Sequence, residues 1–220
     1  MTDLTNIEER HACPDPSRMK LHWSPRSPFV RKVMIAAHEL GLADRIHTVR
    51  TVVRLGKPND DLLPDNPLSK IPTLVLDDGS ALFDSLTIVE YLDDLAGGRL
   101  FPPKPARFEA LTRHALGTGL LDLLILFRNE RDKPAERQTA EWLESFAAKT
   151  RASLDRLESE APSLSAKPFD IGHIAIGCAL SYLDFRFADL DWRAGHPAIA
   201  GWHAEFSARP SVRATEAVDD

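Results

Sequence analysis

Pro72 opens an apolar run, Thr73 to Leu76, that has the composition of a buried strand. Proline lacks the N–H group that a sheet ladder uses, so it is tolerated only at the first residue of a strand, on an edge or at a bulge. Asp78 and Gly79 follow the run, and this pair is a strong signal for a two-residue hairpin turn. The stretch therefore predicts a hairpin of two strands, the first of which begins at a proline, with its second strand at 81–83.

The residues before this hairpin predict a strand, a helix and a second strand. The strands are expected over 19–23 and 45–52, and the helix over 29–40, where apolar residues recur at spacings of three and four. This order is a βαβ unit, whose two strands run parallel. With the hairpin and a further helix over 84–95, we expect a four-stranded mixed sheet.

The second half of the chain contains no convincing strand. A stretch rich in Gly and Pro comes first, and amphipathic or apolar helices are then predicted over 107–129, 134–160, 170–187 and 197–207. The fold class expected is an α/β domain with a four-stranded mixed sheet followed by an all-α helical bundle. The expected division is a polar N-terminal arm, an α/β domain, a linker and a helical domain, at 1–18, 19–96, 97–104 and 105–220.

Charge and composition exclude several classes of protein. The net charge is −6 and no basic cluster is present, which argues against a nucleic-acid or anionic-membrane partner. The longest apolar run, Leu120 to Phe127, is too short to cross a bilayer, and the N-terminal segment lacks the apolar core of a signal peptide. We therefore expect a cytoplasmic protein. Two cysteines make no disulfide framework, and no motif predicts a bound metal.

The stretch 66–85 also has the features of a small-peptide site. A cis Ile71-Pro72 bond costs little and would leave the backbone of Ile71 open to pair with an extended peptide. Asp84 and Ser85 begin a helix, where free N–H groups and a hydroxyl suit a carboxylate and an aspartate suits an ammonium. The alternative is that Asp84 and Ser85 only cap the helix and that Pro72 is trans at a strand edge.

At these residues the sequence resembles the cytosolic glutathione S-transferase superfamily, and in particular its bacterial, serine-type members. The stretch "NPLSKIPTLVLDDGSALFDSLTIVEYLDD" is similar to their glutathione-binding half, and "SPRSPFVRKVMIAAHELGL" to their opening strand, loop and helix. The stretch "FDIGHIAIGCALSYLDFRF" looks like one of their last core helices. The order of an α/β domain, a linker and a helical domain also resembles theirs, which implies that the α/β domain has the thioredoxin-like fold. The resemblance implies that the backbone of Ile71, presented by a cis Pro72, pairs with the cysteinyl unit of glutathione. It further implies that Asp84 and Ser85 hold the γ-glutamyl head, and that Lys57 lies near the glycyl carboxylate.

Members of this family activate the glutathione thiol with a Tyr, Ser or Cys near the start of the first helix. Neither tyrosine lies there, and Cys13 and Cys178 lie elsewhere, in the polar arm and in an apolar helix. Ser24 and Ser27 remain, and alignment with the serine-type classes places Ser27 at the catalytic position. Such a serine donates a hydrogen bond to the thiolate and is not itself a nucleophile.

Two further positions, in the first helix and in the helix near Asp170, carry expectations of their own. Arg31, one turn into the first helix, is expected to be a structural ion-pair partner. In the helix that begins near Asp170, His173 stands where the family usually has an aspartate. Asp170 can still cap the helix, but His173 cannot accept a bond as a carboxylate would, which puts half of the capping box in doubt.

The resemblance implies a glutathione transferase that ionises glutathione, used as a co-substrate without a metal, for attack on a small hydrophobic electrophile. It also implies a cytoplasmic homodimer with a role in detoxification. The alternatives are a non-catalytic binding or assembly module with the same fold, and a glutathione-dependent isomerase or peroxidase. Exchange through a mixed disulfide is disfavoured because it requires a reactive protein thiolate.

Overall fold

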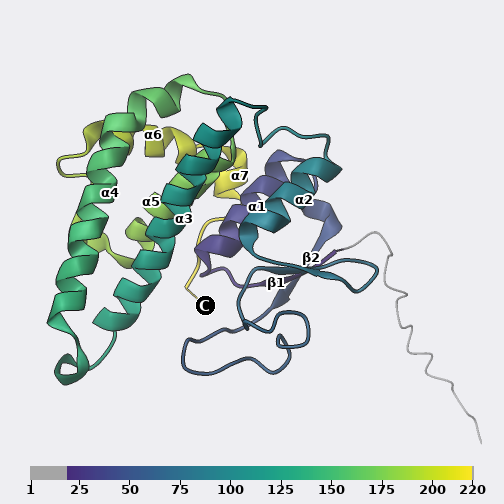
Figure 1. Ribbon diagram of the computed structural model, residues 1–220, viewed down its shortest axis with the longest axis horizontal. Helices are drawn as coiled ribbons and strands as arrows, with labels where there is room; N and C mark the ends of the chain where they lie inside the picture. The colour runs from purple at the N-terminus through teal and green to yellow at the C-terminus, as the bar shows by residue number, and fades with distance from the viewer. Residues whose placement is uncertain (1–18, 220) are drawn as a thin grey trace, which may run out of the picture.

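A computed structural model describes residues 19–219 of the chain. Its first part contains four strands and two α-helices, followed along the chain by five more α-helices (Figure 1). The elements of the first part are β1 (Met19–Trp23), α1 (Pro28–Glu39), β2 (Ile46–Arg50), β3 (Thr73–Val75), β4 (Ala81–Leu82) and α2 (Ser85–Leu95).

The four strands form one mixed sheet in the order β2-β1-β3-β4. β1 runs parallel to β2 and antiparallel to β3, and β3 and β4 form the predicted hairpin. Because a right-handed βαβ crossover returns the chain beside its first strand, α1 packs against the sheet, and α2 packs alongside α1 (Figure 1). The predicted thioredoxin-like arrangement is confirmed.

The second part is helical, as predicted, and residues 97–219 contain no strand. α5 is buried almost all round, which its apolar sequence had indicated, and it packs along α3 and against α1. By length and composition α3 could span a membrane, and in this structure it packs against α5 and α4. The helices are α3 (Ala106–Arg131), α4 (Ala140–Ala166), α5 (Ile171–Arg186), α6 (Pro197–Ser207) and α7 (Pro210–Arg213).

The start of α4 differs from the prediction of a helix over 134–160. The Gln138 side chain donates to the carbonyls of Arg131 and Lys133, and the Thr139 N–H donates to Glu130. These bonds hold the connection after α3 as a loop, so α4 begins only at Ala140 and runs to Ala166.

Two expectations about single residues were wrong. Asp170 caps α5 by accepting from the N–H groups of Gly172 and His173, and Nδ1 of His173 lies 3.2 Å from the Asp170 nitrogen. An imidazole nitrogen thus completes the capping box in place of a carboxylate. Arg31 forms no ion pair with a carboxylate of residues 19–219; its Nη2 donates to the Val212 carbonyl instead.

α7 joins the two parts of the molecule. Arg209 donates through two guanidinium nitrogens to the Glu39 carboxylate at the end of α1, and Ser211 donates to the same carboxylate. The chain then leaves α7 and runs back between the helical part and α1 (Figure 1).

Candidate functional site

The register of the sheet brings three predicted site segments to one edge. His22 lies opposite Thr73 in the β1–β3 pair, so the chain beyond β1, at Ser24, comes level with Ile71. Leu74 lies opposite Leu82 in the β3–β4 pair, so Asp84 comes level with Pro72 on the other side. The loop before α1, the Ile71-Pro72 segment and the start of α2 are therefore neighbours.

The Ile71-Pro72 bond is cis, as the sequence suggested. Among residues 19–219, no backbone group bonds the N–H or C=O of Ile71, because the β3 ladder begins only at Thr73. This backbone stretch is therefore available to a ligand.

Asp84 and Ser85 form the start of α2, and the bond between Phe83 and Asp84 is also cis. The Asp84 carboxylate accepts from the Leu86 N–H at 2.9 Å and remains exposed. Ser85 is only 1% exposed, and its Oγ has no hydrogen-bond partner within residues 19–219. A buried hydroxyl without a partner carries a desolvation cost, and such groups in native proteins call for a functional explanation.

Ser27 is the N-cap of α1. Its Oγ accepts from the Val30 N–H at 3.2 Å, which leaves its own proton free to be donated. Ser24 is buried, and its Oγ lies 3.4 Å from the Arg26 nitrogen, a long contact. Ser27 is thus the better placed donor of the two, at a helix N-terminus where the dipole favours negative charge.

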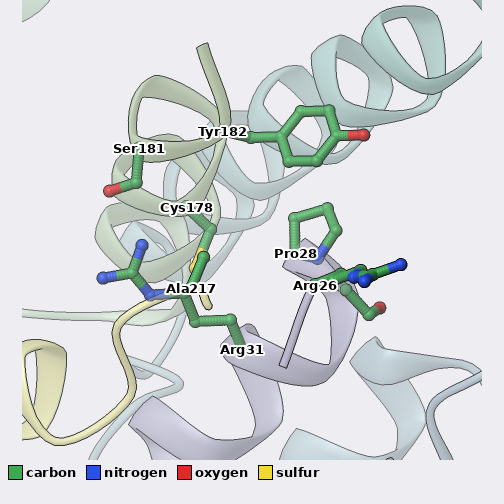
Figure 2. Close-up of a pocket in the computed structure, with 8 residues that line it drawn as sticks. Arg26, Pro28, Arg31, Cys178, Ser181, Tyr182 and Ala217 are labelled. Carbon is green, nitrogen blue, oxygen red and sulfur yellow. The ribbon is translucent and has the colours of Figure 1, made fainter. Parts of the chain in front are cut away.

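A small pocket adjoins Ser27 between α1 and α5. Figure 2 shows Pro28 facing the Tyr182 ring, with Cys178 and Ser181 of α5 beside Arg31 of α1. The remaining lining residues are Arg26 and Ala217. Burial raises the pKa of the Cys178 thiol to about 11, so this sulfur is an unreactive wall of the pocket.

Lys57 is not brought to these residues by any observed contact. It lies exposed in a turn closed by its own bond to the Arg54 carbonyl. Its loop is tied to the site only indirectly, because the Asn59 N–H donates to Ser69, two residues before Ile71.

Sequence reasoning missed a buried lysine at the junction of the two parts. Lys32 is fully buried, and its Nζ donates to Thr118 Oγ1 at 2.9 Å and lies 3.4 Å from His114 Nε2. The signal was available: Lys32 lies on the apolar face of α1, three residues after Phe29 and one before Val33.

Burial dominates the electrostatics of this cluster. It lowers the pKa of Lys32 to about 8, although the Asp84 and Asp122 charges act in the opposite direction. Burial, and second the Lys32 ammonium, lower the pKa of His114 to about 4. Burial raises the pKa of Asp122. His114 is therefore neutral at pH 7 and accepts from the lysine.

The low pKa of His114 predicts a loss of stability in mild acid. The folded pKa lies below the unfolded value of 6.5, so the unfolded chain binds more protons between these pH values. The free energy of unfolding should fall as the pH drops from 6.5 to 4, with a contribution from His114 of about 3 kcal/mol. Urea unfolding at several pH values across this window measures the effect.

In a His114→Gln variant the free energy of unfolding should fall less between pH 6.5 and 4 than in the wild type. His38→Gln, at an exposed position of α1, is the matched control. Equal slopes for wild type and both variants would contradict a buried neutral His114.

Among residues 19–219, no group of three or more His, Cys, Asp or Glu side chains is placed to hold a metal ion.

Comparison with known families gives a consistent result. The family model described as "Glutathione S-transferase, N-terminal domain" matches residues 26–95, and the C-terminal domain model matches residues 140–205. The first match contains most of the site described above, from Ser27 to Ser85.

Individual relatives cover nearly the whole chain. A glutathione transferase family member from Pseudomonas fluorescens Pf-5, solved with bound glutathione, is 42% identical with a TM-score of 0.88, over 91% of this chain and all of that one. A structure from the same organism, solved with bound S-(propanoic acid)-glutathione, is 41% identical with a TM-score of 0.84, at the same coverage. The uncharacterized GST-like protein YibF of Escherichia coli K12 is 31% identical over 90% of this chain and 98% of its own length. The chain belongs to the glutathione S-transferase family.

Proposed function

We propose that this protein is a serine-type glutathione transferase that binds glutathione and ionises its thiol for attack on a small electrophile. The observation that carries the proposal is the Ser85 hydroxyl, which is buried without a partner at the start of α2. A carboxylate at this helix N-terminus would supply the missing acceptor.

Glutathione has groups that match the neighbouring residues. Its γ-glutamyl carboxylate would meet Ser85 and the first N–H groups of α2, and its ammonium would meet the exposed Asp84. Its cysteinyl unit would pair with the open backbone of Ile71, beside the cis Pro72. Lys57 would approach the glycyl carboxylate by movement of its exposed turn. The bound glutathione of the relatives supports this placement.

The thiol would then lie near the start of α1. Ser27 uses its oxygen to cap the helix and can donate its proton to the sulfur, with Ser24 as the second candidate. Lowering a thiol pKa by about two units takes about 2.7 kcal/mol. One charge-assisted hydrogen bond and the helix dipole together can supply this amount. A relative was solved with bound S-(propanoic acid)-glutathione, which supports a site that has room for a substituent on the glutathione sulfur.

We also propose that residues 19–96 and 105–220 act as the glutathione-binding and helical domains, joined by 97–104, in a cytoplasmic homodimer that serves detoxification. Cys178, with its raised pKa, supports conjugation over exchange through a protein disulfide.

A Ser85→Ala variant tests the glutathione site. It should weaken glutathione binding by about tenfold or more, because a bond to a charged carboxylate is lost. It should leave the unliganded protein at least as stable as before, because the hydroxyl has no partner within residues 19–219 to lose and carries a desolvation cost. Calorimetric titration with reduced glutathione and thermal unfolding measure the two effects.

Ser153→Ala is the matched control, since Ser153 is half-buried on α4 and its Oγ donates to the Lys149 carbonyl. Wild-type protein that does not bind millimolar glutathione would refute the proposal. Unchanged affinity in Ser85→Ala would remove Ser85 from it.

A further inference from the structure

The segment after α7 places a carboxylate between two arginines. Arg186 of α5 holds Asp219 through both guanidinium nitrogens, at 2.9 and 3.1 Å, and Nε of Arg26 lies 3.0 Å from the same carboxylate. A carboxylate held by two guanidinium groups in this way is a recognition geometry and not an incidental contact.

This carboxylate lies at the pocket beside Ser27. Arg26 lines that pocket directly, as does Ala217, two residues before Asp219. Arg186 is one turn beyond Tyr182, another lining residue, and so lies on the same face of α5. The two arginines therefore converge at one end of the space in which an electrophile would meet the thiol.

The two partners of the Arg186–Asp219 ion pair differ in the exposed fraction of their side chains. The Arg186 side chain is 14% exposed, its Nε is buried without a partner, and its guanidinium stacks on the Phe185 ring at 3.8 Å. Asp219 is 59% exposed in a segment without regular structure. Asp219 is the exposed partner, so a ligand carboxylate that makes the same contacts can replace it and keep the mostly buried Arg186 guanidinium paired.

The charged side chains that line the pocket, those of Arg26 and Arg31, are both positive. Arg31 also lines the pocket, with a buried Nε that has no partner, and it pairs with no carboxylate of residues 19–219. A neutral second substrate that displaced the segment would leave the mostly buried Arg186 guanidinium without its Asp219 partner.

We infer that Arg26 and Arg186 form a subsite for a carboxylate on the second substrate, and that Asp219 occupies it in the unliganded protein. The inference rests on the proposed function and names its substrate class: small electrophiles that carry a carboxylate. In the reaction the thiolate sulfur forms a bond to the electrophilic carbon. The bond to the leaving group breaks with its electron pair, and the thiol proton has already passed to solvent.

Two matched conjugates test the subsite on the full chain. S-carboxyethylglutathione carries the carboxylate and S-propylglutathione is a neutral analogue of nearly the same size. Wild-type protein should bind the carboxyethyl conjugate more tightly than the propyl conjugate. Arg186→Gln should weaken binding of the carboxyethyl conjugate by about tenfold, with little change in the binding of the propyl conjugate or of glutathione. Asp219→Asn should bind the carboxyethyl conjugate severalfold more tightly, because the competing charge is gone. Titration calorimetry gives each Kd.

Arg156→Gln is the matched control, on the exposed face of α4 in a pair with Glu160. If Arg186→Gln does not fold, the exposed Asp219→Asn change still decides the question. Equal binding of the two conjugates, or weaker binding of the carboxyethyl conjugate by Asp219→Asn, would overturn the subsite while glutathione binding stands. Failure of wild type to bind glutathione and both conjugates would overturn the proposed function itself.

Discussion

A Ser27→Ala change should lower the turnover of glutathione conjugation by about 100-fold and change the Kd for glutathione by less than about threefold. In the proposed site Ser27 stabilises the thiolate, whereas Ile71, Asp84 and Ser85 hold the peptide. Loss of about 2.7 kcal/mol of thiolate stabilisation corresponds to a rate change of this size. Steady-state kinetics with chlorodinitrobenzene, at saturating glutathione, measure the turnover.

The Ser27 side chain also caps α1, so a loss of stability has to be separated from a loss of chemistry. Ser27→Asn and Ser27→Asp keep a capping oxygen, and Asn retains a donor while Asp does not. Turnover retained better by Asn than by Asp, at similar melting temperatures, supports the donor role. Equal losses of affinity and turnover in Ser27→Ala would contradict it, and a larger effect of Ser24→Ala would move the role to Ser24.

Gly117→Ala should destabilise the protein by about 3 kcal/mol or more, the upper range for overpacking. α3 crosses α5 at this glycine so closely that a Cβ atom would lie 2.5 Å from the Ala175 carbonyl carbon and 2.6 Å from the Ile176 nitrogen. These are backbone atoms, so neither can turn aside, and the two helices must separate. Urea unfolding measures the change.

Gly119→Ala is a control within the same helix, because a Cβ atom at Gly119 meets nothing within 4 Å. It should stabilise the protein by about 0.5–1 kcal/mol through helix propensity alone. Similar effects at the two positions would contradict the close α3–α5 crossing.

The elements with clear periodicity could be predicted from sequence. The hairpin at Asp78-Gly79, the apolar stripe of α1 and the largely apolar α5 each point to one local structure. The proline before β3 could also be interpreted from the sequence. Pro72 precedes the first residue of the β3 ladder, so the N–H and C=O groups of Ile71 bond no backbone group of residues 19–219.

The features of the fold that escaped prediction depend on hydrogen bonds from particular polar side chains. The start of α4 is set by Gln138, which satisfies carbonyls at the end of α3. His173 completes its capping box because its ring nitrogen lies close to the Asp170 N–H. Neither contact leaves a pattern of apolar residues that periodicity could detect.

The candidate site could also be predicted from the sequence only in part. Asp84 and Ser85 could be proposed from their place at a helix start, but the absence of a partner for the Ser85 hydroxyl required the structure. Lys32 meets Thr118 of α3, and Asp219 meets Arg26 and Arg186, only after the two parts have folded together.

The central claim is that this site ionises bound glutathione, and the most direct test is the ultraviolet absorbance of the thiolate as a function of pH. Wild-type protein saturated with glutathione should show a thiol pKa about two units below that of free glutathione, and Ser27→Ala should return it most of the way. A bound thiol that titrates like free glutathione in the wild type would contradict the account, even if glutathione binds tightly.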